Sequence, residues 1–357
     1  MTQQFNNHRR TVLKMAGAAG MAAAGVTGVA SSVMAQTKQR VVADPGGPYT
    51  AAYRKAFYDP FEKATGVKIV NVAREAQPVA QLTAMVQTRN FVWDVTTLTL
   101  AQDIPILEEA GMLEPLGIVP TDFKNMLPGS ITSSFVGVDV YATILAYRTD
   151  KFAKNPPKTW ADFWNVEKFP GRRSLRRNAI DTLEQALMAD GVASDKLYPL
   201  DLDRAFKSLD RIKKHVAVWW TSGAQAMQLI QSGEVDMIST WNARAQTAIE
   251  GGAPVAINWN QGLYSIEGWG VPKGNPRAAV AKEFVKFCAD AKRQSGFTDT
   301  LAYGPTALEA YKDIPAARAA ILPTAPANIA LMRPPSGLWW HKNRNAVSDR
   351  FNAWLLS

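Results

Sequence analysis

The sequence predicts an α/β fold, because short apolar strands alternate with amphipathic helices from residue 40 onward. The first three elements carry this prediction. They are an apolar strand at 41–43, an amphipathic helix at 49–65 that ends at Gly66, and a β-prone strand at 67–72. A strand, a helix and a strand in this order indicate two parallel strands joined by a crossover helix.

The same alternation continues along the chain, so each helix is expected to cover one face of a sheet. Further strands are expected at residues 93–98, 141–147 and 235–241. Further helices are expected at residues 77–89, 103–111, 182–190, 202–214, 224–232, 243–250 and 278–292. Proline and glycine clusters between these elements are typical of loops rather than of flexible linkers. Any two domains are therefore expected to be tightly joined.

The N-terminal segment has the pattern of an export signal. Arg9 and Arg10 precede a stretch rich in alanine, glycine and valine, which ends at a small-residue cleavage site at Ala35. The paired arginines with Leu13 and Lys14 resemble the twin-arginine pattern, and a general secretory signal is the alternative. We expect residues 1–35 to be removed and the rest of the chain to reside in the periplasm.

The charge balance of the chain is only mildly basic. The net charge is +9, and loss of the three basic residues before Ala35 leaves 37 basic against 31 acidic residues, or +6. The single dense basic cluster lies at 172–177, so a nucleic-acid partner is not expected. Cys288 is the only cysteine, and it shares an expected helical face with Phe284 and Phe287, which predicts a buried thiol and no intramolecular disulfide.

Six short motifs, taken together in their order and spacing, resemble the type II periplasmic binding proteins. The resemblance is specifically to the polyamine-binding (spermidine/putrescine) group of ABC transporter receptors, and it extends over nearly the whole chain after residue 35. The motifs lie at 57–68 (FYDPFEKATGVK), 109–116 (EAGMLEPL), 146–152 (AYRTDKF), 157–164 (PKTWADFW), 233–242 (GEVD leading to WN) and 269–274 (WGVPKG).

The resemblance implies a two-lobed fold of two parallel or mixed sheets flanked by helices, with a central ligand cleft on which the lobes close. One lobe is expected to comprise residues 36–139 and 262–311, and the other residues 140–261, with a helical tail at 312–357 returning to the second lobe. We expect a monomer without a cofactor or metal, which binds a small solute and delivers it to an inner-membrane ABC permease with its ATPase.

Trp241 and Glu267 are the first candidates for ligand contact. In the polyamine receptors, aromatic rings and carboxylates hold the ammonium ends of the ligand. Trp241 matches their stacking tryptophan, although a core tryptophan is the alternative. Glu267 stands where they carry an aspartate, while Ser265 replaces their second tryptophan.

The segment 175–181 departs most from the polyamine receptors. They carry two carboxylates here, whereas this chain has Asn178 and Asp181, which equally fit a helix N-cap and its third-position partner. Arg176 and Arg177 bring positive charge towards the cleft, which favours an anionic or zwitterionic solute such as an amino acid, opine or phosphonate. Because neighbouring strand residues face opposite ways, at most one arginine is expected to face the ligand.

Three loops that precede helices supply the remaining candidates. Tyr49 resembles the cleft aromatic residue of relatives, with core packing as its alternative, and Thr99 ends an expected strand. Ser222 opens a helix where free backbone N–H groups attract anions, although an ordinary cap explains it as well.

The predicted function is capture of an amine-bearing solute, most simply a polyamine, without catalysis. No Gly-x-Ser-x-Gly, His-Glu-x-x-His, phosphate-binding loop or Cys-x-x-Cys motif supports an enzyme, and a hydrolase built on His215 or His341 is a remote alternative. A ferric-iron receptor is disfavoured because the chain has no adjacent tyrosines. A soluble sensor module that feeds a membrane receptor would use the same cleft.

Overall fold

A computed structural model describes residues 39–75 and 77–357, so the expected export signal at 1–35 lies outside the described residues. From β1 onward the chain clusters as a single compact unit. Within the described ranges, no helix combines the length and the apolar character needed to cross a membrane.

The described strands form one nine-stranded mixed sheet, which confirms the α/β class. Its order is β2-β1-β3-β8-β4-β7-β5-β6, with β9 pairing on β4. The bounds are β1 Gln39–Asp44, β2 Lys68–Ala73, β3 Val95–Thr99, β4 Phe135–Arg148, β5 Arg173–Arg176, β6 Val216–Trp220, β7 Met237–Trp241, β8 Val255–Gly270 and β9 Gly304–Pro305. The pair β1/β2 is parallel, as the strand, helix, strand order predicted, and the pairs β1/β3, β5/β6 and β5/β7 are parallel as well.

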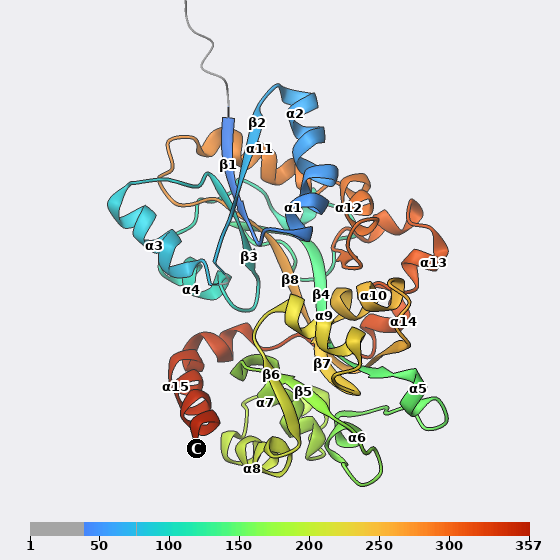
Figure 1. The fold of residues 1–357 in the computed structure, drawn as a ribbon. Helices are drawn as coiled ribbons and strands as arrows, with labels where there is room; N and C mark the ends of the chain where they lie inside the picture. Colours follow the sequence, from blue (N-terminus) through green and yellow to red (C-terminus); the bar gives the residue numbers. More distant parts are fainter. Residues whose placement is uncertain (1–38, 76) are drawn as a thin grey trace, which may run out of the picture. The chain divides into compact units, whose positions relative to one another are not determined.

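Two long antiparallel strands join the parallel groups at either end of the sheet. β4 and β8 have 14 and 16 residues and pair along most of their lengths, so the two expected sheets are continuous through them (Figure 1). The register shifts between Thr143 and Leu145, where residues 259–262 of β8 bulge out of the ladder. Strand β4 is therefore twice as long as the run at 141–147 that the sequence indicated.

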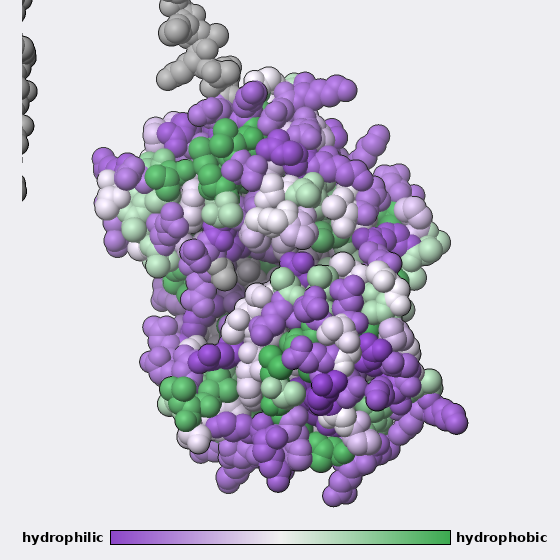
Figure 2. Space-filling model, in the orientation of Figure 1, coloured by the Kyte–Doolittle hydropathy of each residue, from purple (hydrophilic) through white to green (hydrophobic). Residues whose placement is uncertain are grey.

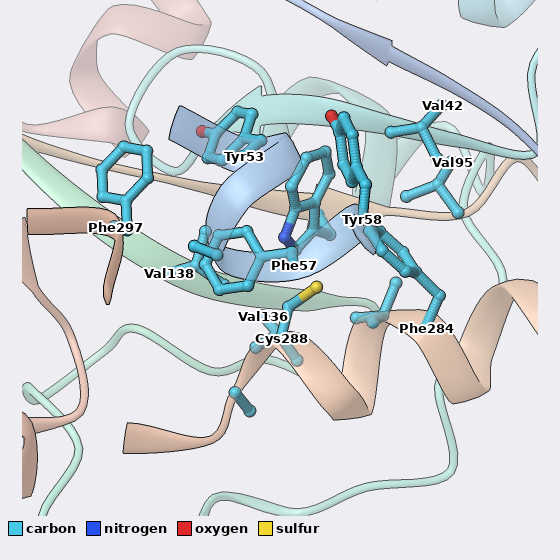
Figure 3. Packing of buried hydrophobic residues seen from close by; sticks show 14 of the residues in the cluster. Val42, Tyr53, Phe57, Tyr58, Val95, Val136, Val138, Phe284, Cys288 and Phe297 are labelled. Carbon is cyan, nitrogen blue, oxygen red and sulfur yellow. The ribbon is translucent and has the colours of Figure 1, made fainter. Parts of the chain in front are cut away.

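The expected helix at 49–65 is helical throughout, but it is not a single α-helix. It consists of α1 (Pro48–Tyr53), a five-residue π-helical segment Arg54–Tyr58 and α2 (Asp59–Thr65), and it ends at Gly66 in the left-handed region, with a φ of 70°. Its aromatic residues pack on α11 and α12. Figure 3 shows Tyr53, Phe57 and Tyr58 together with Phe284 and Phe297.

Two helices from the first part of the chain and two that follow β8 cover β1, β2 and β3. They are α3 (Val79–Thr88), α4 (Ile104–Glu109), α11 (Ala278–Cys288) and α12 (Ala291–Thr298). One continuous helix was expected at 278–292, but Asp290 accepts a hydrogen bond from the backbone N–H of Arg293 and begins a new helix there. Cys288 is fully buried, as predicted, with its sulfur inside the aromatic cluster of Figure 3.

The other helices lie mainly around β5, β6 and β7. Their bounds are α5 (Thr149–Phe152), α6 (Trp160–Trp164), α7 (Ala179–Ala189), α8 (Leu202–Lys213), α9 (Gly223–Ser232), α10 (Asn242–Glu250), α13 (Ala316–Ala319), α14 (Pro326–Ile329) and α15 (Gly337–Leu356). The C-terminal helix α15 buries Trp340, Val347 and Phe351 in one core with α7 and α8. It also contacts α4. Figure 2 shows mostly hydrophilic residues on the visible face, with apolar residues in small separate groups.

Candidate functional site

Trp241, the last residue of β7, lies beneath an arginine. The guanidinium carbon of Arg176 is 4.9 Å from the centroid of the Trp241 ring and 5.7 Å from that of Trp220. Trp220 and Tyr141 meet Trp241 edge-on, with ring centroids 5.3 and 6.2 Å away. A cation of the protein itself therefore lies over the ring that the resemblance assigned to a ligand amine.

Asp181 pairs with the same arginine, whereas Asn178 is a helix cap. The Oδ1 of Asn178 accepts a hydrogen bond of 2.9 Å from the N–H of Ile180. Asp181 is buried and accepts from the Thr143 hydroxyl at 2.9 Å and from Nη1 of Arg176 at 3.5 Å. Its φ of 72° interrupts the first turn of α7, a conformation that costs a non-glycine residue about 1–3 kcal/mol. Burial raises the pKa of Asp181, and the charge of Arg176 opposes that rise.

Glu267 is held in a second ion pair, with Arg74. Nη2 of Arg74 lies 2.8 Å from Oε1 of Glu267, and only 5% and 6% of the two side chains are exposed. Nε of Arg74 also donates to the Thr97 hydroxyl at 2.7 Å. Burial raises the pKa of Glu267, while Arg74 and a hydrogen bond from Tyr49 lower it. The carboxylate expected to await an amine thus already has a cationic partner.

Further carboxyl groups surround Glu267. Asp139 is its cross-strand partner on β4, is fully buried, and accepts a hydrogen bond of 2.8 Å from the Tyr53 hydroxyl. Burial, with the charge of Glu267, raises the pKa of Asp139 well above its usual range. Asp44 and Asp103 are close enough to raise the pKa of Glu267 as well.

Two more arginines, Arg344 and Arg244, lie beside the group formed by Arg176, Trp241 and Asp181. Arg344 of α15 donates to the side chain and carbonyl of Gln102, and burial lowers its pKa. The pKa of Arg344 also responds to the charge of Arg176. Arg244 of α10 is half-buried and has no ion pair or hydrogen bond among the described residues, and its Nε is buried. A Cβ placed on Gly223 would lie 2.7 Å from that Nε and 3.0 Å from Cζ3 of Trp241.

A row of aromatic rings connects the two charged groups. Tyr49, Tyr303 and Tyr141 follow one another with centroid distances of 5.5 and 6.0 Å, and Trp241 follows Tyr141. Burial raises the pKa of Tyr141, and the charges of Asp181, Glu267 and Arg176 all act on its hydroxyl. The site therefore has a basic end at β5, β7, α10 and α15, where Asp181 is the counter-charge, and an acidic end at β1, β3 and β8, where Arg74 is the counter-charge.

The remaining predicted residues lie at the edges of this arrangement. Thr99 is the cross-strand partner of Glu267, and its backbone N–H donates to Asp103 at 2.8 Å. Ser222 is exposed and caps α9 by accepting from the N–H of Gln225. Arg177 has an exposed side chain, whereas Arg176 lies over the Trp241 ring.

Arg74, Arg244 and Arg344 were not among the predicted residues. Arg74 follows the carboxyl end of β2, and this position in the sequence could have identified it as a site residue. Loops after the carboxyl ends of parallel strands gather around the ligand in α/β proteins. Arg244 stands three residues after Trp241, one helical turn along α10. No comparable signal marks Arg344, which reaches the site from the C-terminal helix.

Comparison with known proteins agrees with this architecture. The model of the family "Bacterial extracellular solute-binding protein" matches residues 56–324. The chain is 35% identical over 333 residues to the gamma-aminobutyric acid-binding protein of Pseudomonas aeruginosa, covering 91% of this chain and 93% of that protein. The spermidine/putrescine-binding periplasmic protein of Escherichia coli is 21% identical over 71% of this chain and 74% of its own length, so the polyamine group is a distant relative.

Solved structures give the same result. An ABC transporter substrate-binding protein from Bradyrhizobium japonicum USDA 110 superimposes with a TM-score of 0.83 at 37% identity, covering 88% of this chain and 99% of that one. The periplasmic binding protein AgtB of A. tumefaciens R10, solved in complex with agropinic acid, gives a TM-score of 0.77 at 34% identity, covering 89% and 99%. The fold is the two-lobed fold of periplasmic binding proteins, and the chain belongs to the bacterial extracellular solute-binding protein family of ABC transporter receptors.

Proposed function

We propose that this protein is the periplasmic receptor of an ABC importer for a small zwitterion with a carboxylate and an amine at opposite ends, of the ω-amino acid class. The observation that carries the proposal is the division of charge along the aromatic row. Arg176, Arg244 and Arg344 outnumber Asp181 at one end, and the carboxyl groups around Glu267 outnumber Arg74 at the other.

Each end of such a ligand would meet a complementary end of the site. Arg244 is the strongest candidate for the carboxylate, because its guanidinium has no ion-pair partner among the described residues and is already partly desolvated. The amine would lie near Glu267, with the connecting carbons against Tyr141 and Trp241. The 35% identity to a protein named for gamma-aminobutyric acid binding supports the same class of solute.

We propose the transport cycle that the resemblance to type II periplasmic binding proteins implies. The lobes, 36–139 with 262–311 and 140–261, would close on the solute by bending at the strands that cross between them, β4 and β8. The closed monomer would present the solute to an inner-membrane permease with its ATPase, and neither nucleic acid nor a cofactor would take part. Export would depend on the segment 1–35, cleaved near Ala35.

Three ligands of similar length test the proposal by calorimetry and thermal shift. Gamma-aminobutyrate carries one charge of each sign, putrescine two positive charges, and succinate two negative charges. We expect only gamma-aminobutyrate to bind tightly and raise the melting temperature. Tight binding of putrescine alone would restore the polyamine hypothesis, and binding of succinate alone would assign an anionic solute.

A pair of variants tests the role of Arg244. Arg244→Met removes the charge without breaking an ion pair seen in the described part of the chain, and we expect at least a tenfold loss of affinity for gamma-aminobutyrate. Lys207→Met removes an exposed positive charge on α8 and should leave the affinity unchanged. Equal affinities of the two variants would remove Arg244 from the site.

A further inference from the structure

One edge of β4 is shared by strands from the two expected lobes. β8 pairs with β4 along the other edge, so β7 and β9 occupy the same one. β7 pairs from Thr143 onward, whereas β9 pairs only with Asp139 and Val140. Among the described strands, none therefore pairs with Tyr141 and Ala142 on this edge, which leaves a short gap between β7 and β9.

The side chain of Asn242 fills this gap. Asn242 is the first residue of α10, directly after β7, and it is fully buried. Its Oδ1 accepts a hydrogen bond of 3.0 Å from the backbone N–H of Ala142, and its Nδ2 donates one of 2.5 Å to the backbone carbonyl of Ala302. Because one neighbour is a donor and the other an acceptor, only this orientation of the amide satisfies both. A single amide thus joins β4 to the segment that leads into β9.

Each backbone position that Asn242 binds adjoins a ring of the aromatic row. The N–H lies one residue after Tyr141, the carbonyl lies one residue before Tyr303, and Asn242 itself follows Trp241. The ring centroids are 6.0 Å apart for Tyr141 and Tyr303, and 6.2 Å apart for Tyr141 and Trp241. One side chain therefore contacts the backbone beside three consecutive rings.

Loss of these hydrogen bonds would disturb the backbone on both sides of the gap. Ala142 and Ala302 are both buried, and a buried N–H or carbonyl without a partner is destabilising. The two segments would shift until water or another group pairs with them. The packing of the region has other supports, because Ala243, the next residue of α10, lies in one hydrophobic core with Tyr303. We therefore expect the fold to survive the loss of the amide while the spacing of the rings changes.

We propose that Asn242 is a positioning residue of the ligand site, whose amide fixes the spacing of the rings of Tyr141, Tyr303 and Trp241. The inference rests on the proposed function, because the carbons of the solute are expected to lie against Tyr141 and Trp241. Asn242 acts through these rings rather than on the ligand, since its fully buried amide already bonds two backbone groups.

Calorimetry with gamma-aminobutyrate tests the inference. Asn242→Leu keeps a side chain of similar size but removes both hydrogen bonds, and we expect a loss of affinity of about tenfold, the order of one aromatic contact. Asn328→Leu is the matched control, because the buried amide of Asn328 also donates to backbone carbonyls, those of Ala320 and Leu322, at 2.9 Å. The control should lower the melting temperature, as Asn242→Leu does, and leave the affinity unchanged.

A double-mutant cycle separates a positioning role from a purely structural one. If Asn242 acts through the rings, Asn242→Leu should lower the affinity by at most about threefold in a Trp241→Ala background, because a ring that it positions is gone. The same fold loss in both backgrounds would show that Asn242 acts independently of the row, and would overturn the inference. Asn242→Ala leaves room for water to bond the two backbone groups, and it provides the same cycle if Asn242→Leu does not fold.

Failure of the positioning role can be told from failure of the proposed function. If the unaltered protein and both variants of Asn242 bind gamma-aminobutyrate equally well, the positioning role is wrong and the proposed function stands. If the unaltered protein does not bind gamma-aminobutyrate, the proposed function fails, and the positioning role fails with it.

Discussion

Glu184 offers a direct test of the electrostatics around the site. This residue of α7 is fully buried, and its Oε1 accepts hydrogen bonds from the Tyr198 hydroxyl at 2.5 Å and from Trp340 Nε1 at 2.7 Å. Oε2 is buried and has no hydrogen-bond partner among the described residues. Burial, with a smaller contribution from the charge of Asp181, raises the pKa of Glu184 to about 7.

The raised pKa makes the stability of the folded protein depend on pH in a defined direction. Below about pH 4 the carboxyl is protonated in both the folded and the unfolded chain, so it contributes no pH-dependent term. As the pH rises towards 7, the unfolded chain loses its proton while the folded chain retains it, and stability falls. The difference between the pKa of an ordinary glutamate and a pKa of about 7 corresponds to about 3 kcal/mol in the free energy of unfolding. This contribution to stability is lost in full above neutral pH.

Glu184→Gln should remove this term, because a neutral amide keeps an oxygen acceptor for Tyr198 and Trp340. Urea unfolding at pH 5 and pH 8 measures the effect as a difference in the free energy of unfolding. We expect the unaltered protein to lose about 2–3 kcal/mol more than the variant over this interval. The exposed Glu283→Gln on α11 serves as the control. The same pH dependence in the unaltered protein and in Glu184→Gln would refute the reasoning.

Four further substitutions probe the ligand site by calorimetry. Arg176→Met should weaken binding of gamma-aminobutyrate at least tenfold, whereas Arg177→Met should not, because only the Arg176 guanidinium lies over Trp241; the reverse order would place Arg177 at the ligand. Trp241→Ala should weaken binding by about 1–3 kcal/mol through lost stacking and buried area, with the melting temperature as a check of folding, and unchanged affinity would remove Trp241 from the site. Gly223→Ala should weaken binding by displacing Arg244 and Trp241, since the added Cβ meets both, and unaltered affinity would show that neither side chain needs its present position.

The alternation of strands and helices could be predicted because each element is a local, periodic signal. The long strand β8 (Val255–Gly270) could not, because its periodicity is broken where residues 259–262 leave the ladder. Gln261 has a positive φ of 61° there, and its side chain and carbonyl accept hydrogen bonds from Trp160. That contact joins residues about a hundred positions apart, which a local pattern does not report.

The candidate site was predictable in position but not in pairing. Trp241 and Glu267, both predicted as ligand contacts, lie in the two charged groups of the structure. Arg74, however, lies 193 residues from Glu267 in sequence and gives no local sign of the ion pair. Asn178 and Asp181 have the spacing of a cap and its partner. Only the positive φ of Asp181 turns its carboxylate to Thr143 and Arg176, and this contact distinguishes a residue of the charged group from a partner in a helix cap.

Those pairings favour the proposed amino acid over a diamine. Glu267 pairs with Arg74 and Asp181 pairs with Arg176. Among the described residues, the positive charges without a carboxylate partner then belong to Arg244 and Arg344, at the basic end of the aromatic row.

The second ammonium group of a diamine, placed about 6 Å from one of these arginines, would meet a repulsion of about 3 kcal/mol at an effective dielectric constant of about 20. A carboxylate in the same place would gain a similar amount. Half of that difference corresponds to about a hundredfold in affinity, since each tenfold step requires about 1.4 kcal/mol. A solute with one charge of each sign therefore satisfies both ends of the row, whereas a polyamine satisfies only the end at Glu267.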